Sequence, residues 1–496
     1  MDLSQVTTVD LFALAPELSV LAGALLVLLV ELFLSAGTKQ RVNAIGVISV
    51  TVALGFVVAL AVDGRPRSAF GSMFVVDNYA LLFKAFALSV ALFVLFLSYR
   101  YFAEFRTYQG EYYFLLLSAF IGMMLMASAR DLVMIFIALE LVSVPGFVMA
   151  GLRKFDLRSN EGAMKFFLIG VLSVAVLLYG LSIVYGFTGT TDLVGVAAAL
   201  RENSDIPLLN ASILFVIVGF GFKISAVPFH FWAPDTYEGA PVPVTAFLSV
   251  ASKATGFAGL LQVCFVAFEP VADVWALPLG VIAVVTMTVG NLTALQQTNI
   301  VRLLAYSSIG HAGYMLVPFA VVRAGATELN RTAFAAVLLY LLAYGIMNTA
   351  AFAAVVSVTR GDPTRLISDY AGLGSRAPGT AMGLTLALLS LGGLPLLVGF
   401  WAKFFVFRAA VVAGTAFALV LAAAVVINSV IAMFYYLKVM RTMWMDEPAS
   451  DAKLRPGFAL TFATLALTVL TVGAFFAFDL FARAADISTL VAAATS

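Results

Sequence analysis

Apolar runs long enough to cross a lipid bilayer recur along almost the whole chain, and they limit the folds that it can adopt. A helix needs about 20 apolar residues to span the hydrocarbon core. Hydrophobic residues make up 62% of the sequence and charged residues 11%, whereas a soluble domain has about 25% charged residues. Backbone groups in lipid must be bonded internally, and the short alternating strands of a barrel are not evident. The sequence therefore predicts an all-α polytopic membrane protein.

We expect fourteen transmembrane helices, with the seventh and the twelfth broken. The first seven predicted spans are 11–34, 42–62, 75–98, 112–128, 131–151, 162–187 and 211–231. The second seven are 242–268, 275–295, 300–320, 333–358, 380–406, 414–440 and 457–481.

The positive charges between these spans indicate an orientation. Odd-numbered loops carry about 14 Lys and Arg residues, and the even-numbered loops with the termini carry about 8. The positive-inside rule then places the odd loops in the cytoplasm and both termini outside it. No basic residue precedes Lys39, so the first run lacks the positive start of a signal peptide and is expected to stay as a span. We expect a multi-pass protein of the cytoplasmic (inner) cell membrane.

The span pattern repeats within the chain. Spans five and six recur as spans ten and eleven about 170 residues later, and Lys223 recurs as Lys403. A repeat unit of five spans inverts its topology, which is typical of transporters. The predicted units are the N-terminal spans (1–111), a first repeat (112–268), a second, inverted repeat (269–440) and the C-terminal span with its tail (441–496).

Two lysines lie beside predicted helix breaks. Pro228 follows Lys223, and a Gly-Gly-Leu-Pro run precedes Lys403, so each helix should break near its lysine. A charge at the bilayer centre costs roughly 2.5–3.5 kcal/mol on insertion scales, so such residues are rare and usually functional. The alternative is a kinked structural helix whose lysine extends to the interface.

A third lysine and a glutamate also lie inside apolar spans. Lys253 is near the middle of span eight, where neighbouring hydroxyl groups could solvate it or bind adjacent helices. These hydroxyl groups belong to Ser249, Ser252 and Thr255. A buried carboxylate is tolerated best beside a cation, so we pair Glu140 with Lys223 as a hypothesis. The alternative is a static ion pair that fixes the packing of spans five and seven.

His311 lies in the run AYSSIGHAGYM, among Ser307, Ser308 and Tyr314. Histidine titrates near neutral pH and can pass a proton through either ring nitrogen, although a lone histidine on a packed helix can also be structural. His230, at the end of span seven, is a weaker candidate.

Two further lysines are ambiguous on the sequence alone. Lys165 lies one turn inside span six, where extension to the interface explains it as well as a function does. Lys84 is in the middle of span three, and no partner for it is evident.

Several classes of chemistry are excluded. Cys264 is the single cysteine, which rules out internal disulfides and cysteine-held clusters. P-loop, HExxH and CxxC motifs are absent, and the glycine-rich run 371–379 follows no strand. The net charge of +1 offers no surface for nucleic acid. We therefore expect no metal or cofactor in this chain, and an ion gradient or a partner subunit as its energy source.

The run FKISAVPFHFWAPDTYEGAPVPVTAFLSVASKATGF resembles the signature region of the antiporter-like subunits of respiratory complex I. YSSIGHAGYM and GGLPLLVGFWAKF also match this family, over about residues 75–445. The loop FHFWAPDTYEGAP, and lysine rather than glutamate at 403, match one branch better than its sister subunits. The resemblance implies fourteen helices with inverted five-helix repeats. It assigns a proton relay to Glu140, Lys165, Lys223, Lys253, His311 and Lys403.

The resemblance implies a non-redox subunit of a proton-pumping NADH:quinone oxidoreductase. A proton would enter from the cytoplasm, load Lys223 and Lys253, and cross by His311 to Lys403. NADH, FMN, iron–sulfur clusters and quinone would belong to partner subunits, and the partners would be other membrane subunits, including sister antiporter-like ones. A stand-alone cation/proton antiporter and a structural scaffold with fixed ion pairs remain alternatives, while a membrane-embedded catalytic enzyme is disfavoured.

Overall fold

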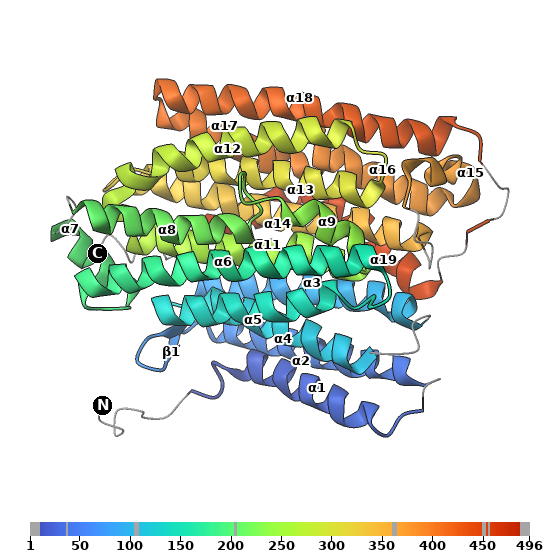
Figure 1. Ribbon diagram of the computed structural model, residues 1–496, viewed down its shortest axis with the longest axis horizontal. Helices are drawn as coiled ribbons and strands as arrows, with labels where there is room; N and C mark the ends of the chain where they lie inside the picture. The colour runs from blue at the N-terminus through green and yellow to red at the C-terminus, as the bar shows by residue number, and fades with distance from the viewer. Residues whose placement is uncertain are drawn as a thin grey trace.

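The computed structural model describes residues 10–35, 38–103, 109–202, 206–359, 365–448, 453–454 and 457–486. Long helices lie side by side from α1 at one edge to α18 at the other (Figure 1). Among the described residues, eleven helices are long and apolar enough to cross a membrane. All fourteen predicted ranges contain helix, which confirms the all-α membrane fold, whereas the count of fourteen spans stays a prediction. Parts of the predicted N-terminal and C-terminal units lie outside the described residues, as do some of the loop charges counted above.

The helices of the first half follow the predicted spans with small shifts at their ends, apart from two short helices that lie between spans. They are α1 (Ala15–Glu31), α2 (Val42–Asp63), α3 (Asn78–Ala103), α4 (Gln109–Ser128), α5 (Leu132–Ala150), α6 (Leu157–Thr188), α7 (Leu193–Glu202), α8 (Pro207–Lys223), α9 (Trp232–Gly239), α10 (Val242–Phe247) and α11 (Lys253–Gln262), with the short turn η2 (Lys39–Arg41) and the π-helical segments η3 (Leu248–Ser252) and η4 (Val263–Ala267).

The second half begins after the 3₁₀ turn η5 (Glu269–Val271). Its elements are α12 (Ala272–Leu295), α13 (Ile300–Leu316), η6 (Val317–Val321), α14 (Thr327–Val358), η7 (Ile367–Tyr370), α15 (Leu373–Arg376), α16 (Pro378–Gly392), α17 (Val398–Ala413), α18 (Ala416–Met445), α19 (Phe458–Phe476) and α20 (Phe478–Asp486).

Polar side chains fix where several helices begin. Asp131 accepts hydrogen bonds from the first backbone amides of α5, Asp156 does so for α6, and Asn299 does so for α13. These amides have no partner inside the helix, so an Asp or Asn side chain at this position stabilises the start. The beginnings of the helices that carry or surround the candidate residues are thus set locally.

Both predicted helix breaks are present. Helix α8 ends at Lys223, and Trp232 Nε1 then donates to the carbonyl oxygen of Phe222 at 3.2 Å. The segment between α8 and α9 is held to α12, because the backbone amide of Val227 donates to Thr286 Oγ1 at 3.0 Å. Helix α16 ends at Gly392, before Gly393 in the left-handed conformation with φ +89°. Freed carbonyl groups are therefore bonded by protein, as a spanning segment requires.

Some of the elements between the predicted spans were not predicted from the sequence. Strands β1 (Arg67–Ala69) and β2 (Phe74–Val76) form an antiparallel hairpin between α2 and α3. Each strand has three residues, which is too short for a periodic hydrophobic pattern to be detected. Helix α7 buries one apolar stripe formed by Leu193, Val196, Ala197 and Leu200, as an amphipathic helix does.

The segment Val242–Ala267 lies at the centre of the protein, since its most apolar window is completely buried. Helices α12 and α13 cross nearby at glycines, and a Cβ atom on Gly290 would lie 2.6 Å from the backbone nitrogen of Gly310. Small residues let membrane helices approach this closely. The contact fixes the position of His311, the next residue on α13.

Candidate functional site

Lys223, the last residue of α8, points its amine toward α5. Its Nζ donates to Ser143 Oγ at 2.9 Å, and the Lys223 residue is 2% exposed. Glu140 lies one turn before Ser143 and interacts electrostatically with Lys223, but the described residues show no ion pair within 4.0 Å between the two. The hypothesis that pairs Glu140 with Lys223 therefore stays a prediction: the two charges interact, and the Ser143 hydroxyl occupies the position next to the amine.

Lys253 joins α11 to α13. Its Nζ donates to the carbonyl oxygen of Ser308 at 2.7 Å and also bonds the Ser308 hydroxyl. The residue is 1% exposed and follows directly on the π-helical segment η3. Such segments frequently occur at functional sites, because they turn a side chain away from the regular helical position.

Two of the three hydroxyl groups expected to solvate Lys253 have other hydrogen-bond partners. Thr255 donates to the carbonyl oxygen of Ala251 at 2.8 Å. Ser249 accepts from Asn348 Nδ2 at 2.9 Å. Helical hydroxyls bond their own preceding turn readily, so the partner of Lys253 comes from another helix.

His311 is held through both ring nitrogens by tyrosines from two other helices. Nδ1 lies 2.8 Å from Tyr340 Oη on α14, and Nε2 lies 3.3 Å from Tyr436 Oη on α18. Tyr436 Oη is also 2.5 Å from Ser307 Oγ. A buried imidazole with a hydroxyl on each side can accept a proton at one nitrogen and release it from the other.

Lys403 lies on α17, behind the break in span twelve. Its Nζ donates to the carbonyl oxygen of Gly392 at 2.9 Å, and the amine is 4.8 Å from the centre of the Tyr314 ring. The Tyr314 ring in turn lies 5.8 Å from the His311 ring, centre to centre. Tyr314 therefore stands between His311 and Lys403.

Sequence reasoning did not find Tyr340 and Tyr436, which contact His311. They lie 29 and 125 residues from it. Both occur in apolar helices where a tyrosine is an ordinary packing residue. A buried tyrosine hydroxyl usually has a hydrogen-bond partner. This rule indicates that Tyr340 and Tyr436 have partners, but it does not identify His311 as the partner.

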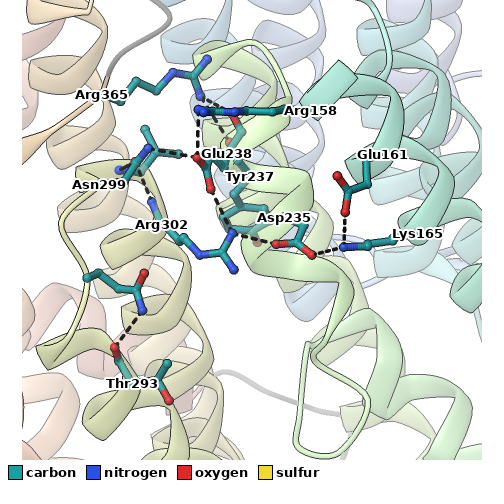
Figure 2. Close-up of polar contacts among 12 residues, drawn as sticks. Arg158, Glu161, Lys165, Asp235, Tyr237, Glu238, Thr293, Asn299, Arg302 and Arg365 are labelled. Atoms are coloured by element: carbon teal, nitrogen blue, oxygen red, sulfur yellow. Dashed lines mark hydrogen bonds and ion pairs between the residues drawn. The ribbon is translucent and has the colours of Figure 1, made fainter. Parts of the chain in front are cut away.

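Lys165 lies in a surface network rather than in the buried interior. Its Nζ is 2.5 Å from Asp235 Oδ2 and 2.6 Å from Glu161 Oε1, and its side chain is 41% exposed. Arg302 on α13 lies 2.7 Å from Asp235 Oδ1 and 2.9 Å from Glu238 Oε2. Figure 2 shows Asp235 between the two cations, so α9 bridges α6 and α13.

The electrostatics of Asp235 follow from this position outside the spanning helices. Partial burial acts to raise the pKa of its carboxyl, but the bonds from Lys165 and Arg302 outweigh it and hold the pKa below the ordinary value. Arg365, which is 2% exposed, donates to the carbonyl oxygens of Glu238 at 2.9 Å and Ala240 at 3.1 Å. Cations thus bind both the side chains and the C-terminal carbonyls of α9.

Lys84 has the partner that the sequence did not reveal. Its Nζ is 2.8 Å from Glu17 Oε1 on α1, with side-chain exposures of 0% and 6%. The amine also lies 4.6 Å from the centre of the Phe74 ring in β2.

His230 lies in the segment between α8 and α9 and is 8% exposed. Its Nδ1 has no hydrogen-bond partner among the described residues.

A helical membrane fold with two broken helices and buried lysines set against hydroxyls and a histidine defines a transporter of the antiporter-like class. Residues 129–432 match the family model "NADH:quinone oxidoreductase/Mrp antiporter, TM". The chain belongs to this family. Within the described residues, no cluster of three or more His, Cys, Asp or Glu side chains could hold a metal ion.

Individual relatives agree with this membership. The chain is 41% identical over 442 residues to NADH-quinone oxidoreductase subunit N of Trichlorobacter lovleyi, covering 88% of each chain. It is 39% identical over 467 residues to subunit N of Dehalococcoides mccartyi, covering 92% and 93%. A chain of respiratory complex I from Thermus thermophilus superposes with a TM-score of 0.77 at 31% identity, covering 94% and 98%. The expected branch, that of subunit N, is confirmed.

Proposed function

We propose that this chain is a non-redox, proton-translocating membrane subunit of NADH-quinone oxidoreductase, working beside other membrane subunits. The names of its relatives support this role. The cofactors NADH, FMN, iron–sulfur clusters and quinone belong to other subunits, where quinone reduction drives the pump. The protein is a multi-pass component of the inner membrane, with its odd-numbered loops in the cytoplasm and both termini outside.

The contacts of the three buried lysines support a relay. Lys223 is bonded to a serine hydroxyl, Lys253 to a serine hydroxyl and carbonyl, and Lys403 to a carbonyl beside an aromatic ring. None of them forms an ion pair within 4.0 Å among the described residues. Lys253 and Lys403, which are held by neutral groups alone, can each lose a proton without leaving a buried carboxylate unpaired. This observation favours a relay over a scaffold of fixed ion pairs.

The proposed path follows these contacts. A proton loads Lys223, whose affinity for it depends on the charge of Glu140, and passes to Lys253. From there it crosses by Ser308, His311 and its two tyrosines to Lys403, near Tyr314. Moving one charge against about 180 mV costs roughly 4 kcal/mol, at 2.3 kcal/mol per 100 mV. We assign Lys165 to positioning α9 at the surface, since its contacts are Glu161 and Asp235.

The arrangement of charges supports the proposed orientation and repeat division. Helix α9 is contacted by three arginines, which lie in odd-numbered loops or at the helix starts that follow them (Figure 2). These are Arg158, Arg302 and Arg365. The division into repeats 112–268 and 269–440 places Lys253 and Ser308 in different halves.

The test is proton pumping by the assembled complex in closed membrane vesicles. Lys223→Met, Lys253→Met and Lys403→Met should each strongly reduce protons moved per NADH oxidised, while the exposed Lys438→Met on α18 should not. Pumping at the wild-type ratio in all three variants would refute the relay. The alternative, a stand-alone antiporter, predicts that the purified chain in liposomes exchanges protons for cations under a salt gradient alone.

A further inference from the structure

A cavity of about 520 Å³ between α16 and α19 lies apart from the buried lysines. Two basic side chains, those of Arg376 and Lys453, belong to its lining, and no acidic residue does among the described ones. Helix α19 contributes a mixed hydroxyl and apolar wall made of Thr461, Thr464, Leu465 and Thr468.

The two helices begin at the same end of the protein, so the charges lie at that end and the wall extends inward. The backbone amide of Leu454 donates to the carbonyl oxygen of Arg376 at 3.3 Å. Deeper in, a Cβ atom on Gly383 would lie 2.7 Å from Thr464 Cγ2. Since α19 is apolar enough to span the membrane, the cavity runs from the interface toward the hydrocarbon region.

Two further features favour an anion in this cavity. Helix α16 has 15 residues, and no side chain caps its N-terminus, where Gly379 and Thr380 line the cavity. A helix N-terminus attracts negative charge through its free amides and its dipole. Independently, Thr464 is 6% exposed and its hydroxyl has no hydrogen-bond partner in the described part of the chain. Most buried polar groups have a hydrogen-bond partner, and a ligand in the cavity would supply one to this hydroxyl.

We propose that this cavity binds an anionic phospholipid. The phosphate lies between Arg376, Lys453 and the start of α16, and one acyl chain follows the wall of α19. Basic pockets between spanning helices at the cytoplasmic side bind anionic headgroups. The apolar depth of the cavity selects a lipid over a soluble phosphate, which needs only the charged end. This site is independent of the proposed relay, and either can fail without the other.

The test uses the full chain in its assembled, purified complex. Photoactivatable phosphatidylglycerol and phosphatidylcholine are cross-linked in parallel, and the labelled peptides are identified by mass spectrometry. Arg376→Gln with Lys453→Gln removes both cavity charges. Lys438→Gln with Arg441→Gln removes two charges from α18, whose Trp444 donates to Thr385 of α16 at 2.9 Å, and serves as the matched control.

Phosphatidylglycerol should label the peptides of α16 and α19, and the cavity variant should bind it about 25-fold more weakly, at roughly fivefold per basic side chain. The control should bind normally, and excess inorganic phosphate should not displace the lipid. Equal labelling by phosphatidylcholine, an equal loss in the control, or displacement by phosphate would overturn the proposal. If the double variant does not assemble, Thr461→Trp fills the cavity without changing charge, and unchanged labelling there would also overturn it.

Discussion

Lys253 Nζ lies 2.7 Å from the carbonyl oxygen of Ser308, and this contact connects α11 with α13 through the centre of the protein. Three residues after Ser308, His311 lies between Tyr340 and Tyr436. The Lys253 amine and the His311 imidazole are therefore carried by two helices, α11 and α13, that are joined by a hydrogen bond.

Removing the Ser308 hydroxyl should weaken the relay without abolishing it. Ser308→Ala leaves the backbone carbonyl as an acceptor for Lys253, so we expect pumping per turnover to fall about tenfold, as for one lost bond to a charged group. Ser249→Ala is the control, because its hydroxyl bonds Asn348 rather than Lys253. An equal fall in both variants would contradict a specific role for Ser308.

The two tyrosines should act through His311. Tyr340→Phe and Tyr436→Phe are each expected to slow proton transfer about tenfold, and neither should add to the effect of His311→Phe, since residues in one network are not additive. Tyr112→Phe is the control, because its buried hydroxyl lies 2.6 Å from Ser98 Oγ on α3. Transfer rates are measured by stopped-flow in vesicles, and additive losses would place the tyrosines outside the path.

Breaking the ion pair of Glu17 and Lys84 should destabilise the protein strongly. Glu17→Gln or Lys84→Met alone leaves one buried charge, which costs about 3–5 kcal/mol, whereas replacing both is close to neutral. Thermal unfolding in detergent should show a large loss for each single variant and recovery in the double variant. Arg331→Gln, from an exposed pair with Glu328, should change stability by less than about 1 kcal/mol. If the double variant is as unstable as the singles, the pair is not the cause.

The network around Asp235 predicts an acid-sensitive stability. Because the pKa of Asp235 is lowered in the folded protein, its ion pairs contribute fully above the ordinary carboxyl pKa of about 3.9 and are lost as pH falls through the lower, folded value. The difference in unfolding free energy between wild type and Asp235→Asn should therefore stay constant from neutral pH down to about 5, where the carboxyl is ionised in both the folded and the unfolded state. The difference should shrink below about pH 4. A difference that persists at the lowest pH would show that the carboxylate charge is not responsible.

The sequence predicted features that depend on local chemistry. Proline and clustered glycines disfavour a continuous helix through their own backbone, so the breaks beside Lys223 and before Lys403 followed from Pro228 and from Gly393 with its neighbours, although Pro145 stays inside α5. The burial of these lysines followed from the apolar residues around them. The three-residue strands and the ten-residue amphipathic helix α7 carried too little periodic pattern to be predicted.

Partners across helices could not be predicted, because they depend on how helices pack. Lys253 had three hydroxyl neighbours in its own segment, yet its acceptor lies 55 residues away on α13. Glu140 was paired with Lys223 because the two charges suit each other, but Ser143 lies closer to the amine. For Lys165, the resemblance assigned a relay role, whereas side-chain geometry places it against Asp235.

The pairing of α1 with α3 through a single carboxylate and a single amine limits how this chain can be shortened. A version that began after the first helix would carry an uncompensated ammonium ion in its interior. Any descendant that discards α1 must therefore also exchange residue 84 for an uncharged one, or supply a new carboxylate from a neighbouring subunit.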